Sequence, residues 1–304
     1  MIKRYSLLLL FSLGIMSAAR AQTNRALVVT IGQYPRHSGW ERIHAENDGE
    51  LVKRMLMKHQ YLPRHIVCLS DSEATKENVT EAIARLHAAV CPGDYIYLHF
   101  SCHGQQMMDD NGDEDDGLDE SIVLYDALFW YIPGKYEGEN HLRDDELGEW
   151  IDKIREKAGE SGQVMVVIDA CHSGTANREN EEEDYIRGTN AVFAPKGYVP
   201  KPGEHQERSR LLLPKRGFSP AMVFSACLPE EINYEYYDMR QKKYFGKLTF
   251  FLWEIIEQAN NNIGINDLMS RLKSKIYHTR RRQTPYMECT SGNMTVKTGT
   301  TKKR

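Results

Sequence analysis

Residues 163–174 read QVMVVIDACHSG, and residues 94–104 read DYIYLHFSCHG. Each stretch is a short apolar run that ends in a polar turn with a glycine, which is typical of a buried strand in a parallel sheet. Similar apolar runs lie at 26–31, 66–69 and 221–226, and helical apolar spacing appears at 47–59, 75–90, 144–157, 248–259 and 265–277. This alternation predicts an α/β fold with an open, mostly parallel sheet flanked by helices.

The composition excludes several classes of protein. The chain has 304 residues, of which 41% are hydrophobic and 27% are charged, an ordinary globular balance that excludes collagen, coiled-coil and low-complexity proteins. The net charge of −4 provides no basic field for duplex nucleic acid, so nucleic acid is not an expected partner. The six cysteines form no CxxC pair, and a chain of this length needs no disulfides to bury a core.

The first 21 residues, MIKRYSLLLLFSLGIMSAARA, have the pattern of a secretory signal peptide. Two basic residues precede an apolar run of about ten residues, whereas a membrane-spanning helix needs about 20. We expect residues 22–304 to form one exported domain, periplasmic or extracellular. After signal removal it is expected to be a monomer without a stable membrane anchor.

The strand ends are the places to look for chemistry, because open α/β sheets bind ligands beyond the carboxyl ends of their strands. His103 follows one predicted strand and Cys171 follows another, so the two side chains form a candidate Cys-His dyad. The residues alone also allow a buried structural Cys beside a hydrogen-bonded His. Ser173 as nucleophile lacks the GxSxG elbow. This region also offers five potential zinc ligands, His99, Cys102, His103, Cys171 and His172. A zinc site is not favoured, because the sequence has no second ligand pair at zinc-finger spacing.

The blocks HFSCHG, DGLDESIVLYD, DDEL and DACHSG, in this order, resemble the caspase-like domain of the metacaspases. The resemblance covers residues 25–174 well and the C-terminal third more loosely, and Cys102 stands where the family usually has glycine. It implies a caspase-like α/β/α sandwich and a cysteine endopeptidase. In that reading His103 is the general base and acid, Cys171 is the nucleophile, and the backbone N–H groups of Gly104 and Cys171 form the oxyanion hole.

The same resemblance implies protein or peptide substrates that are cut after Arg or Lys, through an acidic pocket. Asp169 and Ser101 match the pocket positions, and Asp48 in AENDGE matches a third. A guanidinium can satisfy two carboxylates through bidentate hydrogen bonds. Asp169, at a buried strand end, needs a cationic partner, whereas Asp48 is also explained as an acid in the first turn of a helix.

The acidic run DDNGDEDDGLDE, residues 109–120, is the densest group of hard oxygen ligands in the chain. It does not have the spacing of an EF-hand, and it is explained either as a solvated loop or as part of a calcium site. The resemblance implies Ca²⁺ as an activator, with Asp119, Asp144 and Asp145 as the matching carboxylates. No cofactor is required for the chemistry itself.

Residues 175–217 lack apolar periodicity and are rich in charge, Gly and Pro, which predicts a long exposed loop. A peptidase with a basic preference could cut itself there, and an inert insertion is the alternative. The basic residues in this loop are Arg178, Arg187, Lys196, Lys201, Arg208, Arg210, Lys215 and Arg216. Two alternative functions stay open, a catalytically inert caspase-like calcium-responsive binding protein and a gingipain- or clostripain-like peptidase.

Overall fold

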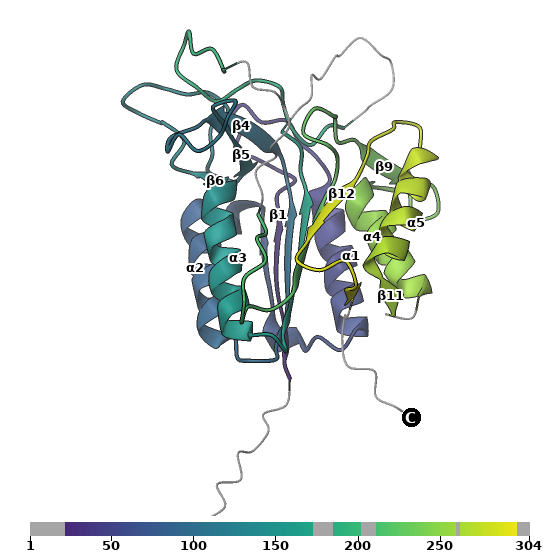
Figure 1. Cartoon of the computed structure of the whole chain (residues 1–304). Coiled ribbons are helices and arrows are strands. Elements are labelled where there is room, and N and C mark those ends of the chain that lie inside the picture. The colour runs from purple at the N-terminus through teal and green to yellow at the C-terminus, as the bar shows by residue number, and fades with distance from the viewer. Residues whose placement is uncertain (1–21, 173–184, 202–210, 260–261, 297–304) are drawn as a thin grey trace, which may run out of the picture.

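The computed structural model describes residues 22–172, 185–201, 211–259 and 262–296. Its central sheet has six strands in the order β12-β8-β7-β3-β1-β2 (Figure 1). Five of them are parallel, and β12 runs antiparallel to β8. The strands are β1 (Asn24–Thr30), β2 (Ile66–Ser70), β3 (Tyr95–Ser101), β7 (Gln163–Asp169), β8 (Ala221–Ser225) and β12 (Tyr286–Cys289). The predicted mostly parallel sheet is therefore confirmed.

Helices cover both faces of this sheet, as Figure 1 shows. One face carries α2 (Lys76–Ala89) and α3 (Asp144–Ala158), and the other carries α1 (Ala45–Lys58), α4 (Lys247–Gln258) and α5 (Ile265–Tyr277). The alternation of side chains along a strand supplies both cores. In β1, Ala26 and Val28 join the α1, α4 and α5 side, whereas Leu27 and Val29 join the α2 and α3 side. The three layers confirm the predicted α/β/α sandwich.

Three smaller sheets were not evident in the sequence. β4 (Gly104–Met108), β5 (Leu118–Val123) and β6 (His141–Arg143) form an antiparallel sheet, β9 (Glu235–Asp238) pairs with β10 (Lys243–Gly246), and β11 (Ile263–Gly264) pairs with β13 (Thr295–Val296). Two 3₁₀ turns, η1 (Pro63–His65) and η2 (Asp71–Glu73), flank β2. These strands are short and rich in polar residues, so they lack the continuous apolar runs that mark the central sheet.

The predicted exposed loop is wrong for part of its length. Within residues 185–201, Arg187 is 0% exposed and Phe193 is 2% exposed. Arg187 hydrogen-bonds to Asp48 and Ser101, which lie 139 and 86 residues away in the sequence. Phe193 is hydrogen-bonded to β4. The rest of the predicted loop is described only from residue 211 onward.

Other expectations have simpler outcomes. The predicted signal sequence, residues 1–21, lies outside the described residues. Within the described ranges no helix has both the length and the apolar character needed to cross a bilayer. All six cysteines are free thiols.

Candidate active site

The register of the central sheet brings the two predicted catalytic residues to one edge. Ser101 at the end of β3 is paired with Asp169 at the end of β7. His103 and Cys171 each follow two residues after this pair, so they leave the sheet side by side. Gly104 lies against Cys171, because a Cβ atom at Gly104 would be 2.7 Å from the carbonyl oxygen of Cys171.

The imidazole of His103 is buried and held from one side. Its Nε2 lies 2.9 Å from the carbonyl oxygen of Glu41, which assigns the ring proton to Nε2. The ring stacks on Trp40 with 5.1 Å between centroids, and the backbone N–H of His103 donates to the hydroxyl of Tyr34. Nδ1 is buried and has no hydrogen-bond partner among the described residues. Burial lowers the pKa of His103 to about 4, so Nδ1 carries a lone pair at neutral pH.

Cys171 has a second thiol beside it. The Cys171 Sγ donates to the carbonyl oxygen of Glu231 at 2.8 Å, and the Cys227 Sγ donates to the same oxygen at 3.4 Å. The hydrogen bond to Cys171 and burial raise the pKa of Cys227 well above its ordinary value. Cys227 is therefore a neutral thiol next to the candidate nucleophile, a neighbour that the sequence did not place there.

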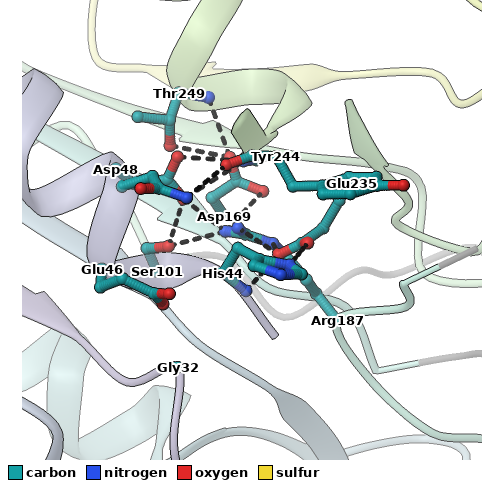
Figure 2. A network of polar contacts seen from close by, with 12 residues as sticks. Gly32, His44, Glu46, Asp48, Ser101, Asp169, Arg187, Glu235, Tyr244 and Thr249 are labelled. Carbon is teal, nitrogen blue, oxygen red and sulfur yellow. Dashed lines mark hydrogen bonds and ion pairs between the residues drawn. The ribbon is translucent and has the colours of Figure 1, made fainter. Parts of the chain in front are cut away.

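The predicted acidic pocket contains a side chain of the protein itself, that of Arg187 (Figure 2). The Arg187 Nη1 lies 2.7 Å from Asp48 Oδ2, 2.6 Å from Ser101 Oγ and 3.8 Å from Asp169 Oδ1. Its Nη2 and Nε donate to Glu235 Oε1 at 2.7 and 3.1 Å. The side chains of Arg187, Asp48, Asp169 and Glu235 are fully buried. The structure thus brings together all three predicted pocket residues.

The electrostatics of this pocket favour a cation. Burial raises the pKa of Asp48 to about 6, although the Arg187 guanidinium opposes this shift. Burial would also raise the pKa of Glu235, but Arg187 and the hydrogen bonds from His44 lower it below its ordinary value. The carboxylates together raise the pKa of Arg187 in spite of its burial. Three carboxylates therefore surround one guanidinium, and Glu235 is a pocket residue that the sequence analysis missed.

Asp169 is fixed by further hydrogen bonds. Its Oδ2 accepts from the backbone N–H of Thr249 at 2.8 Å and from the Thr249 hydroxyl at 2.7 Å, and its Oδ1 accepts from Asn233 at 2.9 Å. A Cβ at Gly246 would overlap the same carboxylate. The carboxylate is therefore held in place whether or not a cation is beside it.

The backbone around Arg187 is hydrogen-bonded to Cys171 and to residues 233–235. The carbonyl oxygen of Arg187 accepts a hydrogen bond of 2.8 Å from the backbone N–H of Cys171, one of the two predicted oxyanion donors. Arg187 N–H donates to Asn233 O at 3.0 Å, Glu235 N–H donates to Tyr185 O at 2.9 Å, and residue 186 forms an antiparallel bridge with residue 234. Residues 185–187 thereby run antiparallel to residues 233–235 and are joined to them by an isolated bridge.

The chain then continues past Cys171 to the other side of the site. Gly188 passes so close that a Cβ at this position would overlap the carbonyl group of Cys171. Farther along, Phe193 pairs with β4. Its N–H donates to Gln106 O at 2.8 Å, and its carbonyl oxygen accepts from Met108 N–H at 3.0 Å. One internal segment therefore crosses the whole site, with Arg187 in the pocket and the bond between Arg187 and Gly188 at Cys171.

Comparison with known proteins assigns this fold to a family. The family model described as "Caspase domain" matches residues 23–295. The chain belongs to the caspase-domain family of cysteine peptidases. Metacaspase-2 of Arabidopsis thaliana is 37% identical over 136 residues, which are 42% of this chain and 30% of that protein. Metacaspase-1 of the same plant is 25% identical over 268 residues, 84% of this chain and 65% of that protein.

Solved structures show the same caspase-like fold. A protein from Geobacter sulfurreducens has a TM-score of 0.59 at 21% identity and covers 88% of this chain and 93% of its own. Caspase-1 from Spodoptera frugiperda has a TM-score of 0.54 at 10% identity and covers 93% and 92%. The chain spans less than two thirds of the length of the curated metacaspases described above.

In the described part of this caspase domain, the candidate zinc ligands do not bring three ligand atoms together. His99 hydrogen-bonds through Nδ1 to the Tyr97 hydroxyl at 3.0 Å and lies 3.4 Å from the Thr249 hydroxyl through Nε2. Burial raises the pKa of Cys102 to about 12, so this thiol stays protonated. Ser173, the alternative nucleophile, lies outside the described residues.

The acidic run folds into a cluster at the edge of the β4-β5-β6 sheet. Asp109, Asp113 and Asp119 each offer a carboxylate oxygen, and these oxygens lie within 4.8 Å of one another. Burial and the nearby Asp144 carboxylate raise the pKa of Asp119 to about 7, although Arg143 opposes this shift. Asp145 accepts a hydrogen bond from Asn111 at 2.7 Å. Of the predicted metal residues, the structure thus places Asp119 inside the cluster and the other two beside it.

A separate pocket opens beside Cys171. Its lining includes Ile122, Leu142, Leu211, Cys227 and Tyr286 together with Cys171. Cys171 therefore lies between the filled acidic pocket and a second, largely apolar pocket.

Proposed function

We propose that this caspase-domain protein is an endopeptidase that cuts proteins or peptides after Arg or Lys through a dyad of Cys171 and His103. The observation that carries this proposal is the position of Arg187. Its guanidinium lies among Asp48, Asp169 and Glu235, while its carbonyl oxygen accepts from the N–H of Cys171. A substrate with a basic residue before the cut can adopt the same position.

The chemistry follows from the two ends of the His103 ring. Because Nε2–H donates to Glu41, the free Nδ1 can take the proton of the Cys171 thiol when that thiol turns away from Glu231. The thiolate attacks the carbonyl carbon, and the N–H groups of Cys171 and Gly104 stabilise the tetrahedral oxyanion. The C–N bond then breaks as His103 returns the proton to the leaving amine. Attack by water on the acyl-enzyme releases the acid product and restores the thiol.

Hydrolysis of matched fluorogenic peptides that end in Arg, Lys or Asp tests this function. We expect cleavage after Arg and Lys, because each cation is neutralised by the three carboxylates of the pocket, and no cleavage after Asp, whose charge those carboxylates repel. Cleavage after Asp alone would contradict the pocket assignment. No turnover of any peptide by the folded, reduced and loop-cleaved protein would favour the inert binding protein.

We also propose that the protein cuts itself between Arg187 and Gly188, and that the uncut segment blocks the pocket. This proposal rests on the substrate-like backbone contacts of residues 185–188. Arg187→Ala is expected to prevent the cut, because an alanine side chain leaves the carboxylates of the pocket unpaired. Mass spectrometry of the purified chain measures the cut as a new N-terminus at Gly188.

Lys196→Ala is the matched control, because Lys196 is an exposed basic residue in the same described segment. This variant is expected to be cut as the wild type is. A Gly188 N-terminus that forms equally well in Arg187→Ala would show that another protease makes the cut.

We propose further that Asp109, Asp113 and Asp119 bind Ca²⁺ as an activator. Calcium takes six to eight oxygen ligands, and the buried Oδ1 of Asp119 has no hydrogen-bond partner among the described residues. Burial and neighbouring carboxylates also raise the pKa of Glu114 to about 7. A bound cation would relieve the repulsion among these groups.

Calcium is expected to raise the melting temperature more at pH 8 than at pH 6. The folded pKa values of Asp119 and Glu114, about 7, lie above the unfolded values near 4, so protons bind the folded chain more tightly and stability falls as the pH rises towards 8. Calcium competes with those protons.

Differential scanning fluorimetry of Asp113→Asn should show a smaller rise in melting temperature with calcium. Asp115 is an exposed acid outside the three-carboxylate cluster, so Asp115→Asn should behave as the wild type does. A calcium effect that is the same at both pH values and in both variants would contradict the site.

A further inference from the structure

Tyr185, two residues before Arg187, lies in an aromatic cradle. Its ring is 4.4 Å from the ring of His44 at an interplanar angle of 90°, and 4.9 Å from the ring of Tyr244 at 69°. His44 and Tyr244 stack on each other with 4.9 Å between centroids. Edge-to-face contacts of this kind add stabilisation beyond the burial of apolar area. The third residue before the candidate cut therefore has its own binding surface.

The backbone of the segment explains why residues 185 and 187 are bound together. Tyr185 O accepts from Glu235 N–H, and Arg187 N–H donates to Asn233 O. Ile186, between them, forms the antiparallel bridge with Tyr234. Side chains two residues apart on an extended strand point to the same face. Any extended peptide bound in this way with a basic residue in the acidic pocket presents its third residue before the cut to His44 and Tyr244.

Glu235 joins the two binding surfaces. It accepts from the backbone N–H of His44 at 2.8 Å, its Oε2 lies 2.7 Å from His44 Nδ1, and its Oε1 binds Arg187. Figure 2 shows His44 and Glu235 beside the guanidinium. The ring of His44 is thereby fixed before a substrate arrives, which lowers the entropic cost of binding an aromatic side chain.

We propose that His44 and Tyr244 form a second specificity site, and that the peptidase selects substrates with an aromatic residue at the third position before the cut. The substrate class is thus aromatic-x-Arg or aromatic-x-Lys. This inference rests on the proposed cleavage after basic residues. It adds a requirement that the acidic pocket alone does not impose.

The test compares fluorogenic peptides that end in Tyr-Ile-Arg and Ala-Ile-Arg, cleaved by the full chain after it has cut itself. The Tyr peptide is expected to have a kcat/KM about tenfold higher, which corresponds to the upper end of the stabilisation from an aromatic contact. In Tyr244→Ala the ratio of the two kcat/KM values is expected to fall close to one. Tyr244→Phe keeps the ring and is expected to keep the ratio.

The outcomes separate this inference from the function on which it rests. Equal cleavage of the two peptides by the wild type would overturn the aromatic site and leave the basic specificity intact. A preference for Tyr that persists in both His44→Ala and Tyr244→Ala would overturn the assignment to these rings. If no peptide that ends in Arg or Lys is cleaved, the proposed function fails, and the inference fails with it.

Discussion

Cys171→Ala is expected to abolish both peptide hydrolysis and self-cleavage, with a loss of at least about 10⁴-fold in kcat, because no acyl-enzyme can form without the nucleophile. The fold is expected to survive, since alanine is small and the backbone N–H of Cys171 still donates to Arg187 O. Hydrolysis of an Arg peptide and the mass of the purified chain measure the two losses.

Cys227→Ala is the matched control for the nucleophile. Its thiol donates to the same Glu231 carbonyl oxygen as Cys171 does, but burial and the hydrogen bond to Cys171 raise its pKa and keep it protonated. We expect this variant to lose less than about tenfold in activity. A reversed result, with Cys227→Ala inactive and Cys171→Ala active, would exchange the roles of the two thiols.

Asp48→Asn is expected to lower kcat/KM for Arg peptides by about 10²–10³-fold, because truncating one partner of a buried charge pair leaves the other charge uncompensated. Asp48 Oδ2 lies 2.7 Å from the Arg187 guanidinium, and both side chains are fully buried. Hydrolysis of peptides with Arg and with the uncharged norleucine at the cleavage site measures the loss of selectivity.

Glu50→Gln, on the same helix, controls for this substitution. The Glu50 side chain is 69% exposed and pairs with Lys243 at the surface. Its loss is expected to change selectivity by less than about twofold, since exposed ion pairs contribute little. If Asp48→Asn keeps the preference of the wild type for Arg over norleucine, Asp48 is not part of the specificity pocket.

The strand ends could be predicted because their signals are local. Continuous apolar runs specify buried parallel strands, and parallel strands end at one edge, so the sequence placed His103 and Cys171 at the carboxyl ends of two strands of one sheet. Asp48, Ser101 and Asp169 were assigned to the pocket through the family resemblance, and the structure puts the Asp48 carboxylate 2.7 Å from the Ser101 hydroxyl. The β4-β5-β6 sheet was missed, because strands such as LDESIV carry polar residues within a short length.

The sequence by itself determined the layered α/β architecture and the pair of catalytic candidates, since hydrophobic periodicity and motif spacing act over a few residues. Only the tertiary structure decided that Arg187 fills the acidic pocket, that Glu235 completes it, and that His44 and Tyr244 face Tyr185. A charged residue in a polar stretch looks exposed in the sequence. The burial of Arg187 depends on the carboxylates of Asp48 and Glu235, which lie 139 and 48 residues away along the chain. The local sequence pattern carries no information about such distant partners.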